Sequence, residues 1–209
     1  MITFNYINLN KRTDRKNSIE LLFKQSKKIK LLRFNAICNK NSKIGCYNSH
    51  IQILENYKNS SENIFIIEDD FCVDDFKLFE TKLFNIIQSK IKFDVLLFGG
   101  NILPNYKIID TNCAQIYHSQ TTTGYCVANH YIDILLEHYK KGLYKLYIQP
   151  ENHYHYSIDK YWILLQNKDK WIIIFPLIVY QKESYSDIEN KIINYKFLML
   201  DSEKKYLSF

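Results

Sequence analysis

Asn63-Ile64-Phe65-Ile66-Ile67-Glu68-Asp69-Asp70 is a short apolar run that ends abruptly in three consecutive carboxylates. The apolar part is typical of a buried strand. Three neighbouring acids repel one another, and a hard divalent cation such as Mg²⁺ or Mn²⁺ removes that penalty. Because the ligands of open α/β sheets bind beyond the carboxyl ends of the strands, the stretch predicts a metal that holds a phosphate-bearing substrate. The alternative is an acidic turn that is simply solvated.

Strands and helices alternate along the first hundred residues. We expect strands at residues 3–9, 31–35, 63–67 and 93–98. Helices are expected between them: one carries Ile19 and Phe23 on a single face, one opens at Gly45, and one is capped by Asp74 or Asp75. This alternation predicts an α/β fold with a mostly parallel central sheet flanked by helices.

The second half of the chain is less regular. The expected elements are short strands at residues 107–109 and 115–118, a polar turn at 121–125, helices at 130–139 and 157–165, and a late strand at 171–175. The sequence has neither internal repeats nor a low-complexity linker. We therefore expect a single domain over residues 1–209.

The composition favours a globular protein of the cell interior. Hydrophobic residues make up 46% of the 209 residues, which is enough for a core. The five cysteines are odd in number and scattered, which favours reduced, buried thiols over a disulfide framework or a zinc site. The N-terminus does not resemble a signal peptide, and no apolar run is long enough to span a membrane. A soluble, cytoplasmic or other intracellular protein is expected.

The formal charge of +6 is modest and spread along the chain. Its densest basic cluster, Lys24, Lys27, Lys28 and Lys30, is mixed with apolar residues, which favours a solvated helix face over a nucleic-acid-binding surface. We therefore expect no nucleic-acid partner, and a basic nucleic-acid-binding protein is the remote alternative. The same charge would also suit an anionic nucleotide substrate.

The three carboxylates are expected to divide their roles. In an extended chain, residues two apart face the same way, so Glu68 and Asp70 would address one site and Asp69 another. If the cation carries a nucleotide diphosphate, Asp70 is the expected direct ligand and Glu68 acts through water. Asp69 would then be available to hydrogen-bond a ribose hydroxyl group.

Three further features have both a functional and a structural interpretation. Arg12 and Arg15 follow the first strand, where α/β folds bind nucleotides, but they also suit a charged helix start. His50 lies in a helix whose N-terminus could receive an anion, yet it shares a face with apolar residues, as a satisfied, half-buried histidine would. Asp159 fits either a catalytic carboxylate or the acid that is favoured in a first helical turn.

The order and spacing of six motifs resemble the family 25 glycosyltransferases, which are the lipooligosaccharide-type and procollagen galactosyltransferase-like enzymes. The resemblance covers nearly the whole chain. The motifs are Ile7-Asn8-Leu9 with Arg12 and Arg15, Gly45-Cys46 with Ser49-His50, Ile67-Glu68-Asp69-Asp70, Thr122-Thr123-Gly124-Tyr125, Asp159, and Pro176 with Gln181 and Ser186-Asp187-Ile188.

The resemblance implies a single GT-A-like, Rossmann-like domain, in which residues 1–100 bind the nucleotide-sugar and residues 101–209 form the acceptor side. It implies an inverting transfer of a hexose, galactose or glucose, from a UDP-sugar to a hydroxyl group of a glycan or protein acceptor. The implied cofactor is Mn²⁺ or Mg²⁺. A catalytically silent nucleotide-sugar-binding protein or a nucleotidyltransferase of the same fold is the alternative.

The resemblance also implies a set of site residues. Asp70 and Glu68 would hold the metal, Asp159 is the expected general base, and Asp187 is its main competitor. The expected donor-binding residues are Asn8, Leu9, Arg12, Arg15, Ser49, His50, Glu68, Asp69, Thr123, Gly124, Tyr125 and Gln181.

Overall fold

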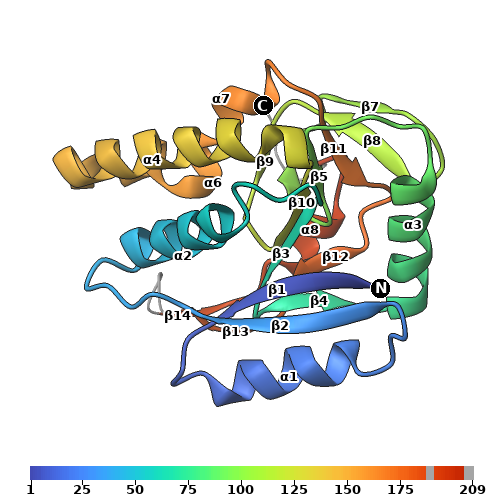
Figure 1. Ribbon diagram of the computed structural model, residues 1–209, viewed down its shortest axis with the longest axis horizontal. Helices are drawn as coiled ribbons and strands as arrows, with labels where there is room; N and C mark the ends of the chain where they lie inside the picture. The colour runs from blue at the N-terminus through green and yellow to red at the C-terminus, as the bar shows by residue number, and fades with distance from the viewer. Residues whose placement is uncertain (187–190, 205–209) are drawn as a thin grey trace.

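The computed structural model describes residues 1–186 and 191–204. Asp187, the competing general base, therefore lies outside the described residues. Within these residues a central eight-stranded sheet has the order β2-β1-β3-β10-β5-β11-β8-β7 (Figure 1). Its strands are β1 (Ile2–Asn8), β2 (Ile29–Asn35), β3 (Ile64–Glu68), β5 (Val95–Leu97), β7 (Tyr106–Ile108), β8 (Cys113–Ile116), β10 (Gly124–Val127) and β11 (Trp171–Ile174).

The sheet is mixed but mostly parallel. Six of these eight described strands run in one direction, and β8 and β10 run against them. The predicted α/β fold with a mostly parallel central sheet is confirmed. The sheet takes strands from both halves of the chain, since β10 lies between β3 and β5.

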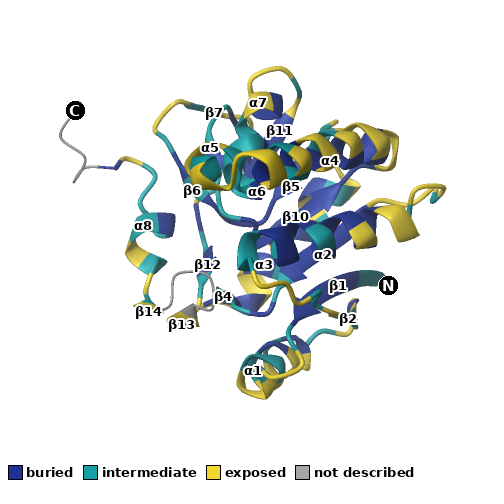
Figure 2. Cartoon of the chain, turned by 90° about the vertical axis from the view of Figure 1, so that its left-hand side faces the viewer, coloured by how far each residue is buried: buried dark blue, intermediate teal, exposed yellow. Residues whose placement is uncertain are grey.

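Two pairs of long helices cover the two faces of the sheet. α1 (Thr13–Phe23) and α3 (Phe76–Gln88) pack on one face, and α2 (Ser42–Asn56) and α4 (Ile132–Ile148) pack on the other (Figure 1). Figure 2 shows the buried strands β1 and β10 between helices whose outer sides are exposed. The order of layers is thus helix, sheet, helix.

The remaining described elements are short. The helical ones are the 3-10 turns Asn129–Tyr131 and Pro150–Asn152, α5 (His153–Tyr156), α6 (Ile158–Tyr161), α7 (Ile163–Gln166) and α8 (Lys196–Leu200). The strands form three small ladders, β4 (Phe71–Val73) with β12 (Val179–Gln181), β6 (Asn101–Ile102) with β9 (Ser119–Gln120), and β13 (Ser184–Ser186) with β14 (Lys191–Ile193).

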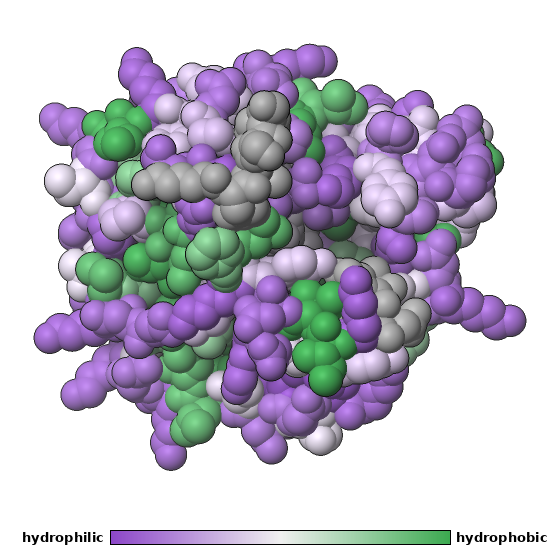
Figure 3. Space-filling view, turned by 180° about the vertical axis from the view of Figure 1, so that it is seen from behind, coloured by the Kyte–Doolittle hydropathy of each residue, from purple (hydrophilic) through white to green (hydrophobic). Residues whose placement is uncertain are grey.

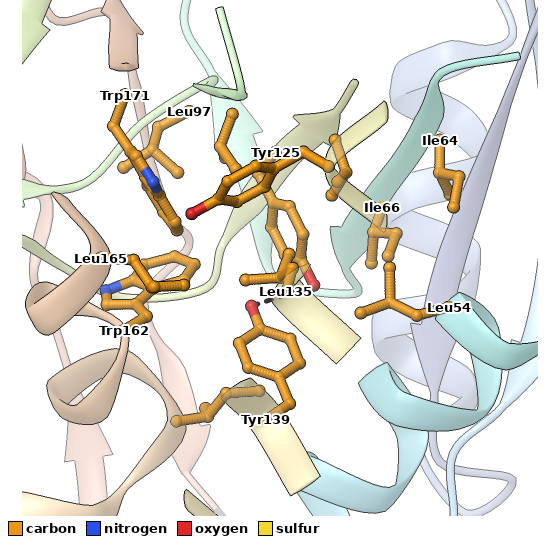
Figure 4. Packing of buried hydrophobic residues seen from close by; sticks show 14 of the residues in the cluster. Leu54, Ile64, Ile66, Leu97, Tyr125, Leu135, Tyr139, Trp162, Leu165 and Trp171 are labelled. Carbon is orange, nitrogen blue, oxygen red and sulfur yellow. Dashed lines mark hydrogen bonds between the residues drawn. The ribbon is translucent and has the colours of Figure 1, made fainter. Parts of the chain in front are cut away.

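β3 supplies apolar side chains to both faces of the sheet. Ile64 and Ile66 pack beneath α2 and α4, whereas Phe65 and Ile67 pack against the helices of the opposite face. Figure 4 shows Ile64 and Ile66 close to Leu54 of α2. A strand that is buried on both faces reads as a continuous apolar run, which explains the sequence of β3. The strand extends to Glu68, one residue beyond the prediction, so Glu68 is held by the sheet.

Several predicted elements are confirmed. The side chain of Asp75 accepts a hydrogen bond from the backbone N–H of Leu78 at 2.9 Å, so Asp75 is the helix cap. The predicted helix at residues 130–139 covers the end of the 3-10 turn Asn129–Tyr131 and the first part of α4, which continues to Ile148 because its buried face continues through Leu146.

The predicted polar turn at residues 121–125 is wrong in its last two residues. Gly124 and Tyr125 begin β10, which is buried and paired on both edges. The strand spans only four residues, and its two partners lie far away in sequence, so local composition did not indicate it. A Cβ atom on Gly124 would lie 2.9 Å from Phe98 and 3.0 Å from Ile67, which explains the glycine.

The single helix predicted at residues 157–165 is also wrong, because α6 and α7 replace it. Their junction is Trp162, whose indole N–H donates to the carbonyl oxygen of Ser119 at 2.8 Å. This tertiary hydrogen bond holds the junction against β9.

The cysteines follow the prediction only in part. All five are free thiols, and Cys113 and Cys126 are buried. Cys38 is exposed, and Cys46 and Cys72 are half-buried. The prediction of free thiols is therefore confirmed, but only two of the five cysteines are buried.

In the described part of the chain, every helix is too short or too polar to cross a bilayer. The face seen from behind is mostly hydrophilic, with hydrophobic residues in separate patches (Figure 3).

Gly124→Ala should destabilise the protein by about 1–3 kcal/mol, because overpacking a closed core position forces its neighbours apart. The measurement is urea denaturation of the variant and the wild-type protein. Lys77→Ala, on the exposed side of α3, is the control and should change the free energy of unfolding by less than about 0.5 kcal/mol. An equally small change in Gly124→Ala would contradict the close packing of β10.

Candidate functional site

A cleft of about 850 Å³ lies at the carboxyl ends of β1 and β3. Its walls come from the start of α1, the segment before α2, α2 itself, residues 120–122, residues 153–160 and the segment from Gln181 to Leu198. Both its size and its place beyond the strand ends are typical of ligand sites in α/β proteins.

Most of the predicted site residues meet in this cleft. The residues that line it are Leu9, Arg12, Arg15, Ser49, His50, Glu68, Asp69, Asp70, Asp159 and Gln181. Four others, Asn8, Thr123, Gly124 and Tyr125, are buried outside the cleft lining. The cleft is therefore formed by segments that lie far apart in the sequence.

Arg15 joins two of the three consecutive carboxylates. Its guanidinium group donates to Asp69 Oδ1 at 2.9 Å and to Asp70 Oδ2 at 3.1 Å. The same group donates to Ser184 Oγ at 2.6 Å and to the carbonyl oxygen of Tyr185 at 3.0 Å. Arg15 thus connects the end of β3 to the C-terminal segment.

The predicted separation of Asp69 from Asp70 is wrong, whereas Glu68 and Asp70 do lie near each other, since the charge of Glu68 helps to raise the pKa of Asp70. Asp69 and Asp70 share Arg15, while Glu68 accepts a hydrogen bond from the hydroxyl group of Thr122 at 2.5 Å. The physical reason is that β3 ends at Glu68 and the next two residues form a turn, so the alternation of an extended strand no longer applies to them.

Asp70 is the least compensated of the three acids. Burial raises its pKa to about 7, the charge of nearby Glu68 adds to the shift, and Arg15 opposes it. Its Oδ1 atom is buried and has no hydrogen-bond partner among the described residues. A buried carboxylate oxygen without a donor is costly, so a cation at this atom would stabilise the site.

Both carboxylate oxygens of Asp69 accept hydrogen bonds, one from Arg15 and the other from Asn8. The amide of Asn8 donates to Asp69 Oδ2 at 2.7 Å and to the carbonyl oxygen of Arg12 at 3.0 Å. Its own oxygen accepts from the guanidinium group of Arg33 at 2.7 Å. Burial still raises the pKa of Asp69, although Arg15 and Asn8 oppose the shift. Asn8 therefore acts on the cleft by positioning Asp69.

His50 is more deeply buried than predicted, and only one of its two ring nitrogens makes a hydrogen bond among the described residues. Its side chain is 1% exposed, and its Nδ1 atom shares a hydrogen bond of 2.7 Å with the hydroxyl group of Tyr125. Nε2 faces Glu68 Oε1 at 3.4 Å and has no hydrogen-bond partner among the described residues. The imidazole and the hydroxyl group of Thr122 lower the pKa of Glu68 against the effect of its burial.

Ser49, the neighbour of His50, makes hydrogen bonds to backbone groups of the surrounding fold. Its hydroxyl group donates to the carbonyl oxygen of Gly45 at 2.8 Å and accepts from the backbone N–H of Ile37 at 2.9 Å. These bonds hold the segment before α2 against the helix, and this segment forms one wall of the cleft.

Asp159 lies in the first turn of α6 and lines the same cleft. The backbone N–H of Thr121 donates to its Oδ2 atom at 3.2 Å, and burial raises its pKa. Thr121 has a φ angle of 75°, in the left-handed region that threonine rarely adopts. Strained residues cluster at functional sites, and a carboxylate with a raised pKa is suited to accept a proton.

Two side chains that line the cleft, Thr122 and Cys46, are not among the site residues predicted from the sequence. Thr122 bonds to Glu68, and Cys46 lies one helical turn before His50 on the same face of α2. The spacing of Cys46 and His50, four residues on one helix, is a signal that the sequence contained. Their nearness to Glu68 was not visible there.

The chain matches no family model and no curated protein. Among solved structures it is similar to a protein described as mannose-1-phosphate geranyltransferase from Thermus thermophilus. The TM-score is 0.46 and the sequence identity is 8%, over 82% of this chain and 72% of that chain. A likeness this remote carries no argument about the activity of this chain.

In chelator-treated protein, the free energy of unfolding should fall as the pH rises from about 4 to about 7. The folded-state pKa of Asp70 is about 7 and its ordinary value is 3.8, so over this range the folded state binds a proton that the unfolded state has lost. Stability falls with rising pH wherever the folded state binds more protons.

Asp70→Asn removes this group and should make the decline shallower, while Asp69 and Asp159, whose pKa values are also raised, still contribute. Urea denaturation at pH 4, 5.5 and 7 measures the slopes. Equal slopes in the variant and the wild-type protein would contradict a raised pKa at Asp70.

Proposed function

We propose that the chain is a metal-dependent inverting glycosyltransferase that moves a hexose from a UDP-sugar to a hydroxyl group of a glycan or protein. The observation that carries the proposal is one cleft in which the carboxylates at the end of β3 and the carboxylate of Asp159 both take part. An inverting displacement requires this combination, because one side of the sugar faces the leaving diphosphate and the other faces the acceptor. The six ordered sequence motifs support it.

The residues present suit a divalent cation. Asp70 has a buried oxygen without a partner among the described residues, and Glu68 lines the same floor of the cleft. Asp70 would be the direct ligand and Glu68 would act through water. Bound Mn²⁺ or Mg²⁺ would offset the negative charge that develops on the departing diphosphate.

Several basic side chains line the cleft. They include Lys11, Arg12, Arg15, Lys40 and Lys43, and positive charge raises the local concentration of an anionic donor. Arg12 is held by Asp14 at 2.8 Å and by the carbonyl oxygen of Tyr185 at 2.9 Å. Because Nε and Nη2 both pair with Asp14 and Nη1 donates to Tyr185, Arg12 would contribute to donor binding through its positive charge.

On the acceptor side, Asp159 would remove the proton of the attacking hydroxyl group. Its hydrogen bond from Thr121 orients one oxygen, and its raised pKa brings it closer to the working pH of a general base. Lys160 lies next to it and lines the cleft as well. Asp187 remains the second candidate for this role.

Addition of a UDP-hexose together with Mn²⁺ should raise the melting temperature by about 5–10 °C at a ligand concentration near 100 Kd. Asp70→Asn should lose the part of the shift that depends on Mn²⁺, because the direct ligand is gone. Asp133→Asn, an exposed acid on α4, is the matched control and should keep the full shift. A full Mn²⁺-dependent shift in Asp70→Asn would remove Asp70 from the metal site.

Asp159→Asn should lower turnover by about 10²–10⁴-fold with donor affinity nearly unchanged, since only proton removal is affected. The assay follows UDP release that depends on an added acceptor. If Asp187→Asn loses transfer while Asp159→Asn keeps it, the two roles are exchanged.

The same assay separates the alternatives. Tight donor binding without acceptor-dependent release of UDP indicates a catalytically silent nucleotide-sugar-binding protein. Release of pyrophosphate from a nucleoside triphosphate and a sugar phosphate indicates a nucleotidyltransferase instead.

A further inference from the structure

We propose that Cys46, His50 and Glu68 form a binding site for a borderline-soft divalent cation, Zn²⁺ being the best match, on the floor of the cleft. The Sγ atom, one imidazole nitrogen and one carboxylate oxygen lie within 4.8 Å of one another. Thiolate, imidazole and carboxylate are the three ligand types that zinc takes in proteins. Nothing in this inference depends on the glycosyltransferase proposal.

One ligand-to-ligand distance already fits a tetrahedral shell, and all three donor atoms lie within 4.8 Å of one another. With metal–ligand bonds of about 2.0–2.3 Å, neighbouring ligand atoms of tetrahedral zinc lie about 3.3–3.6 Å apart. His50 Nε2 and Glu68 Oε1 lie 3.4 Å apart, a distance that suits two ligands of one ion better than a good hydrogen bond. Cys46 and His50 are four residues apart on α2, which places both on one face of the helix.

The imidazole nitrogen that would bind the ion faces Glu68 Oε1 at 3.4 Å but makes no hydrogen bond among the described residues. His50 is 1% exposed and its Nε2 atom is buried without a hydrogen-bond partner there. Buried polar atoms of native proteins nearly always have a partner. A cation between Nε2 and Glu68 satisfies this nitrogen.

The ligands are held in place by further hydrogen bonds, as in known metal sites. The hydroxyl group of Tyr125 contacts His50 Nδ1 at 2.7 Å. The same hydroxyl group accepts a hydrogen bond from Tyr139 at 3.4 Å, and Figure 4 shows these two tyrosines. With Nδ1 protonated and donating to Tyr125, the lone pair of Nε2 is free for the metal. Thr122 orients Glu68 from the other side.

The site also has an entry path and an open position. All three ligand residues line the cleft, so an ion reaches them from solvent. Three protein ligands leave the fourth tetrahedral position to water or to a bound ligand, which is the pattern of catalytic rather than closed structural zinc sites. The sequence offered no pair of cysteines at zinc spacing, because two of the three ligands are not cysteines.

The test is a titration of metal-free protein with Co²⁺, whose bond to a thiolate absorbs in the near ultraviolet. We expect one Co²⁺ per chain with this absorption, displaced by Zn²⁺. Cys46→Ser should abolish the absorption, and Tyr125→Phe should weaken Co²⁺ binding about 10–100-fold, as loss of a hydrogen bond to a metal-bound histidine does.

Cys38→Ser is the matched control, because Cys38 also lines the cleft but is exposed and does not belong to the ligand cluster. It should leave the absorption unchanged. Circular dichroism confirms that each variant is folded, and Cys46→Ala repeats the test if the serine variant is not.

The inference is overturned if the wild-type protein shows no thiolate absorption at saturating Co²⁺. It is also overturned if the absorption persists in folded Cys46→Ser or Cys46→Ala, or if it disappears in Cys38→Ser. Failure of sugar transfer has no bearing on these outcomes, because none of them measures activity.

Discussion

The constraint on which the rest of the site depends is the set of three adjacent carboxylates at the end of β3, of which Asp69 is buried and Glu68 and Asp70 are half-buried. Taking a carboxylate out of water is costly unless it is paired or hydrogen-bonded. The chain meets this cost differently for each acid. Asp69 is bonded to Arg15 and Asn8, and Glu68 to Thr122 beside His50. Asp70 shares Arg15 but keeps one buried oxygen without a partner among the described residues.

These contacts bring distant parts of the chain to one place. Arg15 reaches Ser184 and Tyr185 in the C-terminal segment, and the backbone N–H of Lys182 donates to the carbonyl oxygen of Asp70 at 2.7 Å. The floor of the cleft is therefore closed by residues from both ends of the chain. Because their charges and hydrogen bonds are shared, a substitution at Arg15 would disturb Asp69 and Asp70 together.

The central position of β10 gives the two sides of the cleft a common frame. The strand continues from Thr122, which bonds to Glu68, and Thr121, which bonds to Asp159. Because β10 is paired with both β3 and β5, the residues before it fix the position of Glu68 relative to Asp159 in the first turn of α6. Catalytic groups on such rigid elements keep their geometry better than groups on long loops.

Local patterns in the sequence determined the α/β class, the strand β3 with its acidic end, and a helix cap at Asp74 or Asp75, because each depends on residues a few positions apart. Ten of the residues that line the cleft were also predicted from the sequence, but none of those from the segment before α2 or from beyond Gln181. Tertiary structure alone decided that Gly124 and Tyr125 belong to a central strand, since that strand is defined by partners far away in sequence. It also decided that Arg15 pairs with both Asp69 and Asp70, and that Cys46 and His50 of α2 meet Glu68. Periodicity predicts which way a side chain points within one element, but only packing decides which side chains meet.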